Sequence, residues 1–256
     1  MKQIVIAQPL GVSKETLDTL FTPLTDKGYH LTLWDSLPAD QEDLGNRISK
    51  ADLAVIANYP LKKEARDKAC SLKYLCVAFT GVDHVDIETC REKHIAVSNC
   101  AGYSTESVAE LAIGMILSLY RKLAEGADAA HHGKTGAGLR GIEIKDRTVG
   151  IIGTGAIGYR TAQLVKAFGA RVIGYNRSHN HDDITYTDLD TLLKTSDIVS
   201  VHLPLNAETR HFINGEKLLL MKKEAILINT ARGGVIDNKA LAQALKDGKI
   251  AGAGID

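Results

Sequence analysis

The feature that most constrains the fold is a regular alternation of short apolar runs with segments of helical periodicity. The runs are rich in β-branched residues and have the length of buried strands, whereas the segments between them carry apolar residues at helical spacing. Because consecutive parallel strands must be joined by a crossover, usually a helix, this alternation predicts an α/β fold with helices on both faces of parallel sheets. We expect strands at 4–7, 31–34, 53–57, 74–78 and 95–98, and then at 149–152, 171–175, 198–202, 225–229 and 250–255.

The predicted strands fall into two groups that are separated by a long helix and a polar segment. Apolar residues repeat on one face of residues 105–123, which predicts the helix, and residues 124–146 are rich in glycine and small side chains. We interpret residues 124–146 as an exposed excursion from the body of the protein. Two parallel-sheet domains are therefore expected, covering residues 1–98 and 99–256.

A glycine fingerprint gives the second domain its strongest local signal. A predicted strand runs directly into Gly153, Gly155 and Gly158, and a helix and another strand follow. In dinucleotide-binding turns the first glycine permits a tight turn, the second lets the backbone approach a pyrophosphate, and the third lets the helix pack on the strand. Backbone N–H groups at the start of the helix, around Ala156 and Ile157, would then face the phosphates. An isolated glycine pattern is weak evidence, but this complete strand–turn–helix–strand context indicates a dinucleotide site.

The residues after the second strand of this fingerprint select the cofactor. A carboxylate there would accept hydrogen bonds from the adenosine ribose and repel a 2′-phosphate, whereas this chain has Asn176, Arg177 and Ser178. Asparagine removes the repulsion, and arginine and serine can donate hydrogen bonds to a phosphate. We therefore expect NADP(H) to be preferred. In the alternative interpretation Arg177 is a solvated loop residue, and the enzyme is dual-specific or uses NADH. Asp182 and Asp183 lie too far along the loop to serve as the missing acid.

Five motifs in a fixed order extend the interpretation from the cofactor to the reaction. They are FTGVDHVD (79–86), NCAGYSTESVAELA (99–112), GIIGTGAIG (150–158), VHLPLNAETRHFI (201–213) and INTARGGVIDNKAL (228–241). Together they resemble the D-isomer-specific 2-hydroxyacid dehydrogenase family over essentially the whole chain. The resemblance implies a flavodoxin-like substrate domain in residues 1–98 and a Rossmann cofactor domain in residues 99–256. It also implies reversible hydride transfer between NAD(P)H and a small 2-oxo acid, which yields a D-2-hydroxy acid.

The resemblance assigns the main catalytic role to Arg232, which would bind and polarise the 2-oxo acid. The position agrees with this role, because the arginine follows a predicted buried strand and lies at the carboxyl edge where open parallel sheets bind ligands. A guanidinium can hold a carboxylate by two contacts and stabilise negative charge on a carbonyl oxygen. On position alone, a surface loop residue is an equal alternative.

Other site residues are assigned by the resemblance alone. Backbone N–H groups at Thr80 and Gly81 would hold the substrate carboxylate, and Tyr103 would line the substrate cleft. An ordinary turn and a packed linker tyrosine are the respective alternatives. Contacts with the cofactor are implied at four further positions, Pro204, Thr209, Thr230 and Asp256. For Thr209 the alternative is a purely structural turn.

The family's proton donor has no counterpart among these motifs. In similar proteins the strand that matches residues 251–256 is followed by a glutamate and then by a histidine that protonates the new hydroxyl. The chain stops at Asp256, so we expect a C-terminally truncated enzyme that is inactive without these two residues. None of the nine histidines is an obvious replacement, because His84 and His202 suit structural roles and others lie in the polar excursion.

Composition narrows the choice of partners and location. Lysine plus arginine and aspartate plus glutamate both number 31, so no net field favours nucleic acid or an anionic membrane. No apolar run reaches membrane-spanning or signal-peptide length, which favours a cytoplasmic protein. The four cysteines lack metal-ligand spacing, so we expect reduced thiols and no metal site. By analogy with the family, we expect a homodimer that forms through the cofactor domain.

Two other functions stay open on the sequence alone. One is a nucleotide-sensing regulatory protein on the same scaffold, which would bind the cofactor without catalysis. The other is a dehydrogenase of the same fold that acts on a different substrate, such as phosphite. Each would retain the glycine fingerprint, so cofactor binding alone does not separate them from a 2-hydroxyacid dehydrogenase.

Overall fold

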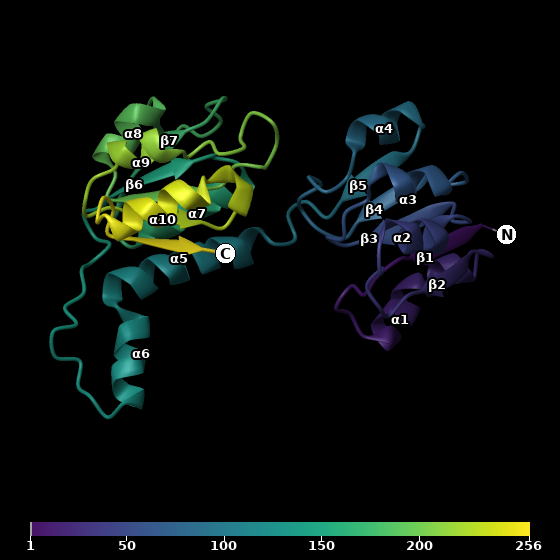
Figure 1. Cartoon of the computed structure of the whole chain (residues 1–256), viewed down its shortest axis with the longest axis horizontal. Coiled ribbons are helices and arrows are strands. Elements are labelled where there is room, and N and C mark those ends of the chain that lie inside the picture. Colours follow the sequence, from purple (N-terminus) through teal and green to yellow (C-terminus); the bar gives the residue numbers. More distant parts are fainter. Residues whose placement is uncertain (1) are drawn as a thin grey trace. The chain divides into compact units, whose positions relative to one another are not determined.

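The computed structural model describes residues 2–256, and the chain divides after Tyr103 into two compact units (Figure 1). The expected boundary, between residues 98 and 99, falls at the end of the last strand of the first unit, β5 (Ala96–Asn99). Each unit contains one sheet, and every pairing of neighbouring strands in it is parallel. The predicted α/β class with two parallel-sheet domains is therefore confirmed.

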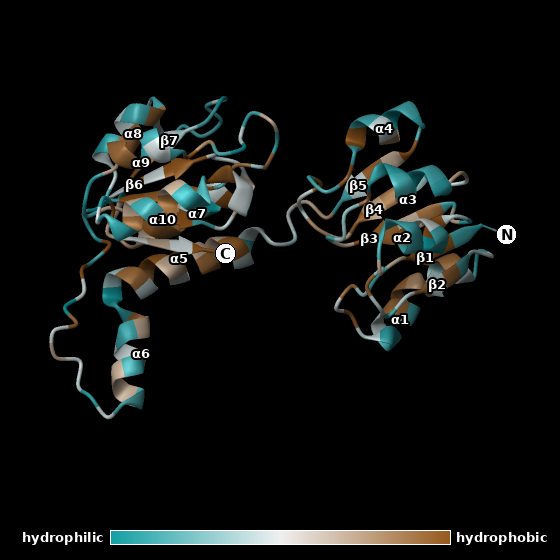
Figure 2. Ribbon diagram, viewed as in Figure 1, coloured by the Kyte–Doolittle hydropathy of each residue, from teal (hydrophilic) through white to brown (hydrophobic). Residues whose placement is uncertain are grey.

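The first unit has a five-stranded sheet in the order β2–β1–β3–β4–β5, which is the flavodoxin-like order. Its other strands are β1 (Gln3–Ile6), β2 (His30–Leu33), β3 (Leu53–Ile56) and β4 (Tyr74–Val77). The helices between them are α1 (Lys14–Thr25), α2 (Gln41–Ile48), α3 (Lys63–Lys68) and α4 (Ile87–Glu92). In Figure 2 hydrophilic residues predominate on α2 and α3, whereas the strands that they cover are largely hydrophobic.

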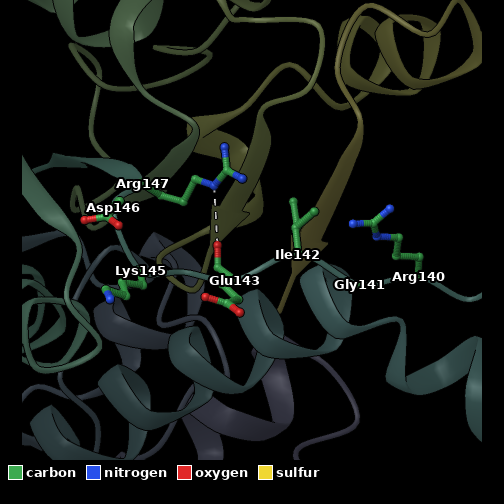
Figure 3. A pocket seen from close by; sticks show the side chains of 7 residues that line it. All are labelled: Arg140, Gly141, Ile142, Glu143, Lys145, Asp146 and Arg147. Atoms are coloured by element: carbon green, nitrogen blue, oxygen red, sulfur yellow. Dashed lines mark hydrogen bonds between the residues drawn. The ribbon is translucent and has the colours of Figure 1, made fainter.

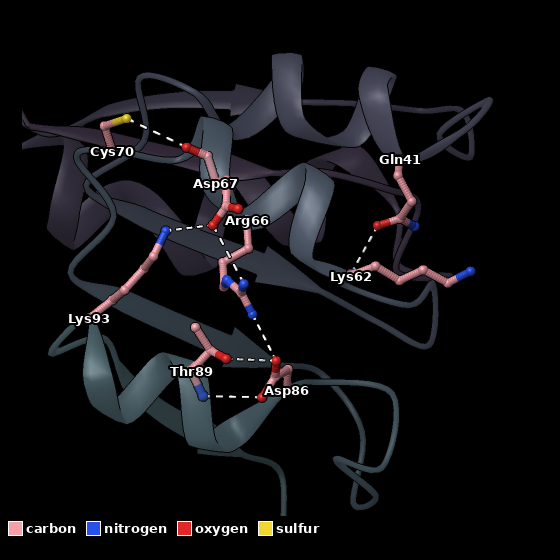
Figure 4. A network of polar contacts seen from close by, with 8 residues as sticks. All are labelled: Gln41, Lys62, Arg66, Asp67, Cys70, Asp86, Thr89 and Lys93. Carbon is pink, nitrogen blue, oxygen red and sulfur yellow. Dashed lines mark hydrogen bonds and ion pairs between the residues drawn. The ribbon is translucent and has the colours of Figure 1, made fainter.

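An ion pair between a buried arginine and an exposed aspartate joins α3 to the start of α4 (Figure 4). Arg66 is only 2% exposed, and its Nη1 donates to Oδ2 of Asp86, the N-cap of α4, at 2.8 Å. Thr89 donates to the same carboxylate from its backbone N–H at 3.1 Å and from its hydroxyl at 2.7 Å. The hydrogen bonds from Thr89, together with the Arg66 guanidinium, hold the pKa of Asp86 below its ordinary value. This network fixes the helix that follows the predicted substrate loop.

The second unit has a six-stranded sheet in the order β11–β10–β9–β6–β7–β8. Its strands are β6 (Thr148–Ile152), β7 (Arg171–Tyr175), β8 (Thr185–Tyr186), β9 (Ile198–Val201), β10 (Ile226–Asn229) and β11 (Gly252–Ile255). Its helices are α5 (Thr105–Arg121), α6 (Leu123–His131), α7 (Ala156–Ala167), α8 (Leu189–Thr195), α9 (Gly215–Leu220), α10 (Asn238–Lys246) and the 3₁₀ turn η1 (Gly233–Val235).

The strand order of this sheet reverses beside β6. From β6 the chain moves outward through β7 to β8, and then returns to the other side of β6 and moves outward through β9 and β10 to β11. Ligands of open α/β sheets bind outside the carboxyl ends of the strands at such a reversal, because neighbouring crossovers leave the sheet there on opposite faces. The end of β6 is therefore the position at which this fold is expected to bind a dinucleotide.

The segment between α5 and β6 lies mostly outside the body of the second unit. The helix predicted for residues 105–123 ends earlier, at Arg121, because Lys122 has a left-handed φ of 51° that breaks it from α6. No residue of α6 is buried, and Figure 1 shows this helix projecting from the rest of the unit. Ile144, which is 4% exposed, marks the return of the chain to the core. The excursion predicted for residues 124–146 thus contains a helix that the sequence analysis missed.

Candidate active site

The glycine turn lies between β6 and α7, at the reversal of the sheet. Gly153 has a φ of +90°, which glycine adopts without strain, and a Cβ there would lie 2.8 Å from the carbonyl oxygen of His202. A Cβ at Gly158 would overlap the carbonyl oxygen of Gly153, so this glycine lets α7 pack directly on the turn. A Cβ at Gly155 would meet none of the described atoms within 4 Å. The middle of the turn is therefore open, as pyrophosphate binding requires.

The first turn of α7 presents backbone N–H groups that the helix itself cannot satisfy. Gly155 is the N-cap and has no side chain that could accept a hydrogen bond. The first bond within the helix comes from the N–H of Tyr159, which donates to the Gly155 carbonyl oxygen at 2.8 Å. The N–H groups of Ala156, Ile157 and Gly158 precede that bond and lie at the positive end of the helix dipole. This end of the helix fits the pyrophosphate of a dinucleotide.

The loop after β7 carries the three residues predicted to select the cofactor. Asn176 donates from Nδ2 to the carbonyl oxygen of Ser178 at 2.9 Å, which turns the chain directly after the strand. Arg177 is exposed, and its Nη1 lies 3.2 Å from Oε2 of Glu208. Asp183 is paired with a lysine of α7, with 2.7 Å between Nζ and Oδ2. The start of the loop therefore offers a cation and a hydroxyl, and the nearby acid is engaged elsewhere.

The loop after β9 holds Thr209 in a compact turn. The Thr209 hydroxyl donates to the carbonyl oxygen of Pro204 at 2.6 Å and accepts the backbone N–H of Asn206 at 2.8 Å. This geometry corresponds to the structural-turn alternative for Thr209, because the hydroxyl is used within the loop. Pro204 is exposed at the same edge of the sheet as the glycine turn.

His202 is the residue that directly follows β9. Its Nε2 lies 2.9 Å from the hydroxyl oxygen of Ser200, a buried residue. Although the exposed fraction of the side chain makes it only half-buried, burial of the ring lowers the pKa of His202 to about 4. The imidazole is therefore neutral near pH 7, and it suits the structural role expected for it.

Arg232 leaves the carboxyl end of β10 in a turn that hydrogen bonds hold at both sides. Asn229 donates from Nδ2 to the carbonyl oxygen of Arg232 at 3.0 Å, and its Oδ1 accepts the N–H of Ala231 at 3.1 Å. The guanidinium of Arg232 donates from Nη1 to the Ala231 carbonyl oxygen at 3.1 Å. Since β10 and β6 are parallel members of one sheet, Arg232 and the glycine turn lie at the same edge.

A second polar group at this edge points to a ligand. Thr230 is only 7% exposed, and its Oγ1 has no hydrogen-bond partner among the described residues. A buried hydroxyl in this condition loses its hydration without compensation, and native structures contain few of them. At the carboxyl edge of the sheet, a bound ligand could supply the partner. The glycine turn and Thr230 therefore both fit a dinucleotide cofactor.

The residues predicted to bind substrate belong to the first unit and lie after β4 and β5. The carbonyl oxygen of Thr80, next to Gly81, accepts a hydrogen bond from Nδ2 of Asn99 at 2.6 Å. Tyr103 is 62% exposed and packs edge-on against Phe79, with 6.5 Å between the ring centroids. These contacts place all three predicted residues at the carboxyl edge of the first sheet.

Two further predicted residues have mainly backbone or structural contacts. The Nε2 atom of His84 lies 2.7 Å from the carbonyl oxygen of Ala57, so this histidine ties a turn to the strand edge. The backbone N–H of Asp256 donates to the carbonyl oxygen of Asn229 at 3.0 Å and extends the pairing of β11 with β10. His181 also contacts the glycine turn, and it was not predicted because its loop has no motif or periodicity in the sequence.

A hollow of about 570 Å³ lies elsewhere in the second unit (Figure 3). It is lined by residues 140–143 and 145–147, where Nε of Arg147 donates to the carbonyl oxygen of Glu143 at 3.4 Å. This segment precedes β6, so the hollow is at the opposite end of that strand from the glycine turn.

In residues 2–256, no three His, Cys, Asp or Glu side chains are grouped as metal ligands would be. None of the helices in that range is long and apolar enough to span a bilayer.

Comparison with known protein families identifies the second unit. Residues 113–256 match the NAD-binding domain of the D-isomer specific 2-hydroxyacid dehydrogenases. The chain belongs to this family. As a D-2-hydroxyacid dehydrogenase, it is an oxidoreductase that transfers a hydride between a nicotinamide dinucleotide and a small 2-oxo acid. The alternative of a nucleotide-sensing regulator finds no support among its relatives.

The relatives of this dehydrogenase extend over both units. It is 39% identical over 230 residues to a glyoxylate reductase of Thermofilum pendens, with 86% of this chain and 68% of the relative covered. It is 38% identical over 221 residues to a hydroxypyruvate reductase of Thermotoga maritima, covering 85% and 72%. Since both matches exceed the length of the second unit, the family assignment extends to residues of the first.

Solved structures with bound cofactors agree with the fold of the dehydrogenase. An acyclic imino acid reductase in complex with NADPH and D-Arg matches with a TM-score of 0.92 and 33% identity, covering 99% of this chain and 82% of that one. The D-lactate dehydrogenase from Aquifex aeolicus, complexed with NAD and lactic acid, matches with a TM-score of 0.87 and 35% identity, covering 100% and 76%. A nicotinamide cofactor is therefore shown for this fold, whereas the two structures differ in which one they contain.

Proposed function

We propose that this dehydrogenase prefers NADPH and reduces a small 2-oxo acid such as glyoxylate or hydroxypyruvate. The observation that carries the proposal is the carboxyl edge of the second sheet. An open glycine turn, an uncapped helix N-terminus and a loop that starts without a carboxylate lie there together. The glyoxylate and hydroxypyruvate reductases among the relatives support the substrate class.

The cofactor preference is argued from the exposed pair of Arg177 and Glu208. Their side chains are 83% and 77% exposed, and such surface pairs contribute about 0–1 kcal/mol. The guanidinium can therefore exchange Glu208 for a 2′-phosphate at small cost, and a phosphate bound in two-point contact compensates for it. Ser178 adds a hydroxyl donor beside it. The NADH molecule lacks the 2′-phosphate and gains nothing from these groups.

Substitution of Arg177 tests the preference directly. We expect Arg177→Ala to raise the Kd for NADPH about tenfold, which corresponds to one charge-assisted contact, and to leave the Kd for NADH within about twofold. Both values come from titrations of cofactor fluorescence. Arg171→Ala is the matched control, because Arg171 is exposed at the opposite end of β7. Equal losses for both cofactors would contradict the proposed preference.

The proposed catalytic roles follow from charge and position. The reduced cofactor, when bound, supplies the hydride. Arg232 holds the 2-oxo acid and stabilises negative charge on its carbonyl oxygen, and the N–H groups of Thr80 and Gly81 hold the carboxylate. In this proposal residues 1–98 form the substrate domain, with Tyr103 beside it, and residues 99–256 form the cofactor domain. Further proposed cofactor contacts are Pro204, Thr230 and Asp256. Thr209 is proposed to contact the cofactor through atoms other than its hydroxyl, which is engaged within the loop.

Turnover is tested with the full-length gene product, because the expected proton donor has no counterpart in residues 1–256. We expect NADPH oxidation that depends on glyoxylate or hydroxypyruvate. Arg232→Lys keeps the charge but loses the planar two-point contact, so it should lower kcat/KM about 100-fold without changing the Kd for NADPH. Absence of turnover with glyoxylate, hydroxypyruvate and pyruvate would count against the substrate class, and turnover of phosphite would replace it.

We also propose a homodimer that forms through the second unit. Leu111 on α5 is 39% exposed and Leu123 at the start of α6 is 55% exposed, while α6 buries none of its residues within the unit. A partner subunit that covers these side chains would remove apolar area from water. Light scattering should give twice the chain mass, and Leu123→Glu should shift the protein towards monomer. A monomeric wild-type protein would refute this assembly.

A further inference from the structure

The loop between β7 and β8 is attached directly to the glycine turn. The Nε2–H of His181 donates to the carbonyl oxygen of Thr154, 3.1 Å away, and Thr154 lies within the turn. The imidazole also stacks on the ring of Tyr159 in α7, with 3.6 Å between centroids and 3° between planes. His181 therefore joins the loop that carries Arg177 to the turn and helix that would bind a pyrophosphate.

The far end of the same loop reaches the same residue of the turn. The hydroxyls of Thr154 and Tyr186 lie 2.9 Å apart, and the ring of His179 stacks on Tyr186 with 4.2 Å between centroids. Thr154 is 1% exposed, so these contacts form away from water, where hydrogen bonds are electrostatically stronger. His181 thus bonds the backbone carbonyl oxygen of Thr154, and Tyr186 of β8 bonds its side-chain hydroxyl.

We propose that His181 is a positioning residue for cofactor selectivity, which rests on the proposed preference for NADPH. By holding the loop on Thr154, it fixes Arg177 and Ser178 relative to the glycine turn. The pyrophosphate and the 2′-phosphate belong to one ligand, so both can be bound at full strength only if turn and loop keep a constant separation. If the ligand must first order the loop, the conformational entropy lost on ordering lowers the affinity for that ligand.

A second attachment of the loop does not replace this one. Asp183 pairs with Lys166 of α7 and lies next to β8, so it secures the end of the loop that is further from Arg177. The ring of His179 contacts β8 rather than the turn. Two side chains bond Thr154, those of His181 and Tyr186, and His181 is the closer of them in sequence to Arg177. Loss of His181 would remove the hydrogen bond that joins the middle of the loop to the turn. Arg177 and Ser178 would then be held relative to the turn only indirectly, through the stacking of His179 on Tyr186.

The test compares NADPH and NADH binding in variants of His181. His181→Phe keeps a ring that can stack on Tyr159 but removes the hydrogen bond to Thr154. We expect it to raise the Kd for NADPH about five- to tenfold, as expected when a binding loop loses its order, and the Kd for NADH less than about twofold. His181→Gln can still donate and should recover part of the selectivity. His132→Ala, at an exposed histidine of the same unit, is the control and should change neither Kd.

Each outcome of the titration decides the inference. A selective loss of NADPH affinity in His181→Phe, with an unchanged circular dichroism spectrum, supports it. Equal losses for both cofactors would mean that His181 only shapes the turn, and unchanged Kd values would mean that the loop is ordered without it; either result overturns the inference and leaves the cofactor preference intact. If the wild-type protein binds NADH more tightly than NADPH, the preference itself fails and this inference fails with it.

Discussion

In both units the first strand of the sheet is followed by a helix, α1 after β1 and α7 after β6, but the N-termini of the two helices are capped differently. In the first unit α1 follows Ser13, whose hydroxyl accepts the N–H of Thr16 at 3.3 Å, so the helix N-terminus is satisfied by its own chain. In the second unit α7 follows Gly155, which has no side chain to accept a hydrogen bond. The comparison teaches that one N-cap residue decides whether a helix end is a structural terminus or an anion site.

The two helices also differ in how much of their surface is buried against the sheet. No residue of α1 is buried, whereas α7 buries Gly158, Thr161, Ala162 and Val165. Gly158 permits this burial because its missing side chain lets the helix touch the turn. A helix that is to hold a phosphate at a fixed position must itself be held, and only α7 of these two is anchored along its length.

The largest expected effect on cofactor affinity comes from adding a side chain at Gly158, where α7 touches the glycine turn. In Gly158→Ala the new methyl group overlaps the carbonyl oxygen of Gly153, so α7 must move away from the turn. We expect the Kd for NADPH to rise about 100-fold, since several backbone N–H groups lose their alignment together. Gly126→Ala in α6, where a Cβ meets no described atom within 4 Å, is the control. An unchanged Kd in Gly158→Ala would show that the packing of α7 does not set the site.

A pH titration separates the stability of the two units. The pKa of His202 in the folded chain is about 4, below its ordinary value of 6.5, so its contribution to stability is complete above pH 6.5 and is lost as the pH falls towards 4. The full shift corresponds to roughly 3 kcal/mol, and because the side chain is only half-buried we expect the second unit to lose about 2 kcal/mol over that window. Trp34, the single tryptophan, reports unfolding of the first unit by fluorescence, and circular dichroism reports both. His202→Asn should abolish the pH dependence, and a variant with the same slope would contradict the assignment.

Installing an N-cap in the second unit should make it behave like the first. Gly155→Asp places a carboxylate where Ser13 places a hydroxyl, and the backbone of Gly155 is already extended, with a φ of −69° and a ψ of −170°. We expect about a tenfold rise in the Kd for NADPH, because the carboxylate occupies the N–H groups and repels the pyrophosphate. Gly155→Asn caps without charge and should lose less affinity. Equal losses in the two variants would assign the effect to capping alone.

Removing the N-cap of the first unit should have the smallest effect. Ser13→Ala deletes the acceptor for the N–H of Thr16 and should lower the stability of this unit by about 1 kcal/mol. Denaturant unfolding followed by Trp34 fluorescence measures it, and the Kd for NADPH should not change. Ser13→Asp, which restores an acceptor, is the control. A change in NADPH affinity would show that the two helix ends are not independent.

The sequence predicted most of the strands because a strand buried on both faces contains a continuous apolar run, as in residues 226–228 of β10. It missed β8, since Thr185 and Tyr186 pair only with β7 and form no such run. It also missed α6, whose alanines and glycine give no apolar stripe. The break after Arg121 arises from the left-handed backbone of Lys122, a conformation that no local pattern indicated.

The site was predictable where it is built from contiguous motifs. Gly153, Gly155 and Gly158 are needed by a single turn, so their spacing between a predicted strand and a predicted helix predicts the geometry that the structure shows. Contacts between distant segments have no such signal. His181 and Thr154 are 27 residues apart, and neither belongs to a periodic pattern, so their hydrogen bond could be found only in three dimensions.

The helix α6 has a consequence for how this enzyme could be monitored. It has 9 residues and buries none of them, and isolated helices shorter than about 12–15 residues are marginal in water. In the proposed dimer, a partner subunit would pack against this helix and stabilise it. Amide hydrogen exchange along Leu123–His131 would consequently report self-association as slowed exchange, at a place remote from the glycine turn and without any label at the catalytic residues.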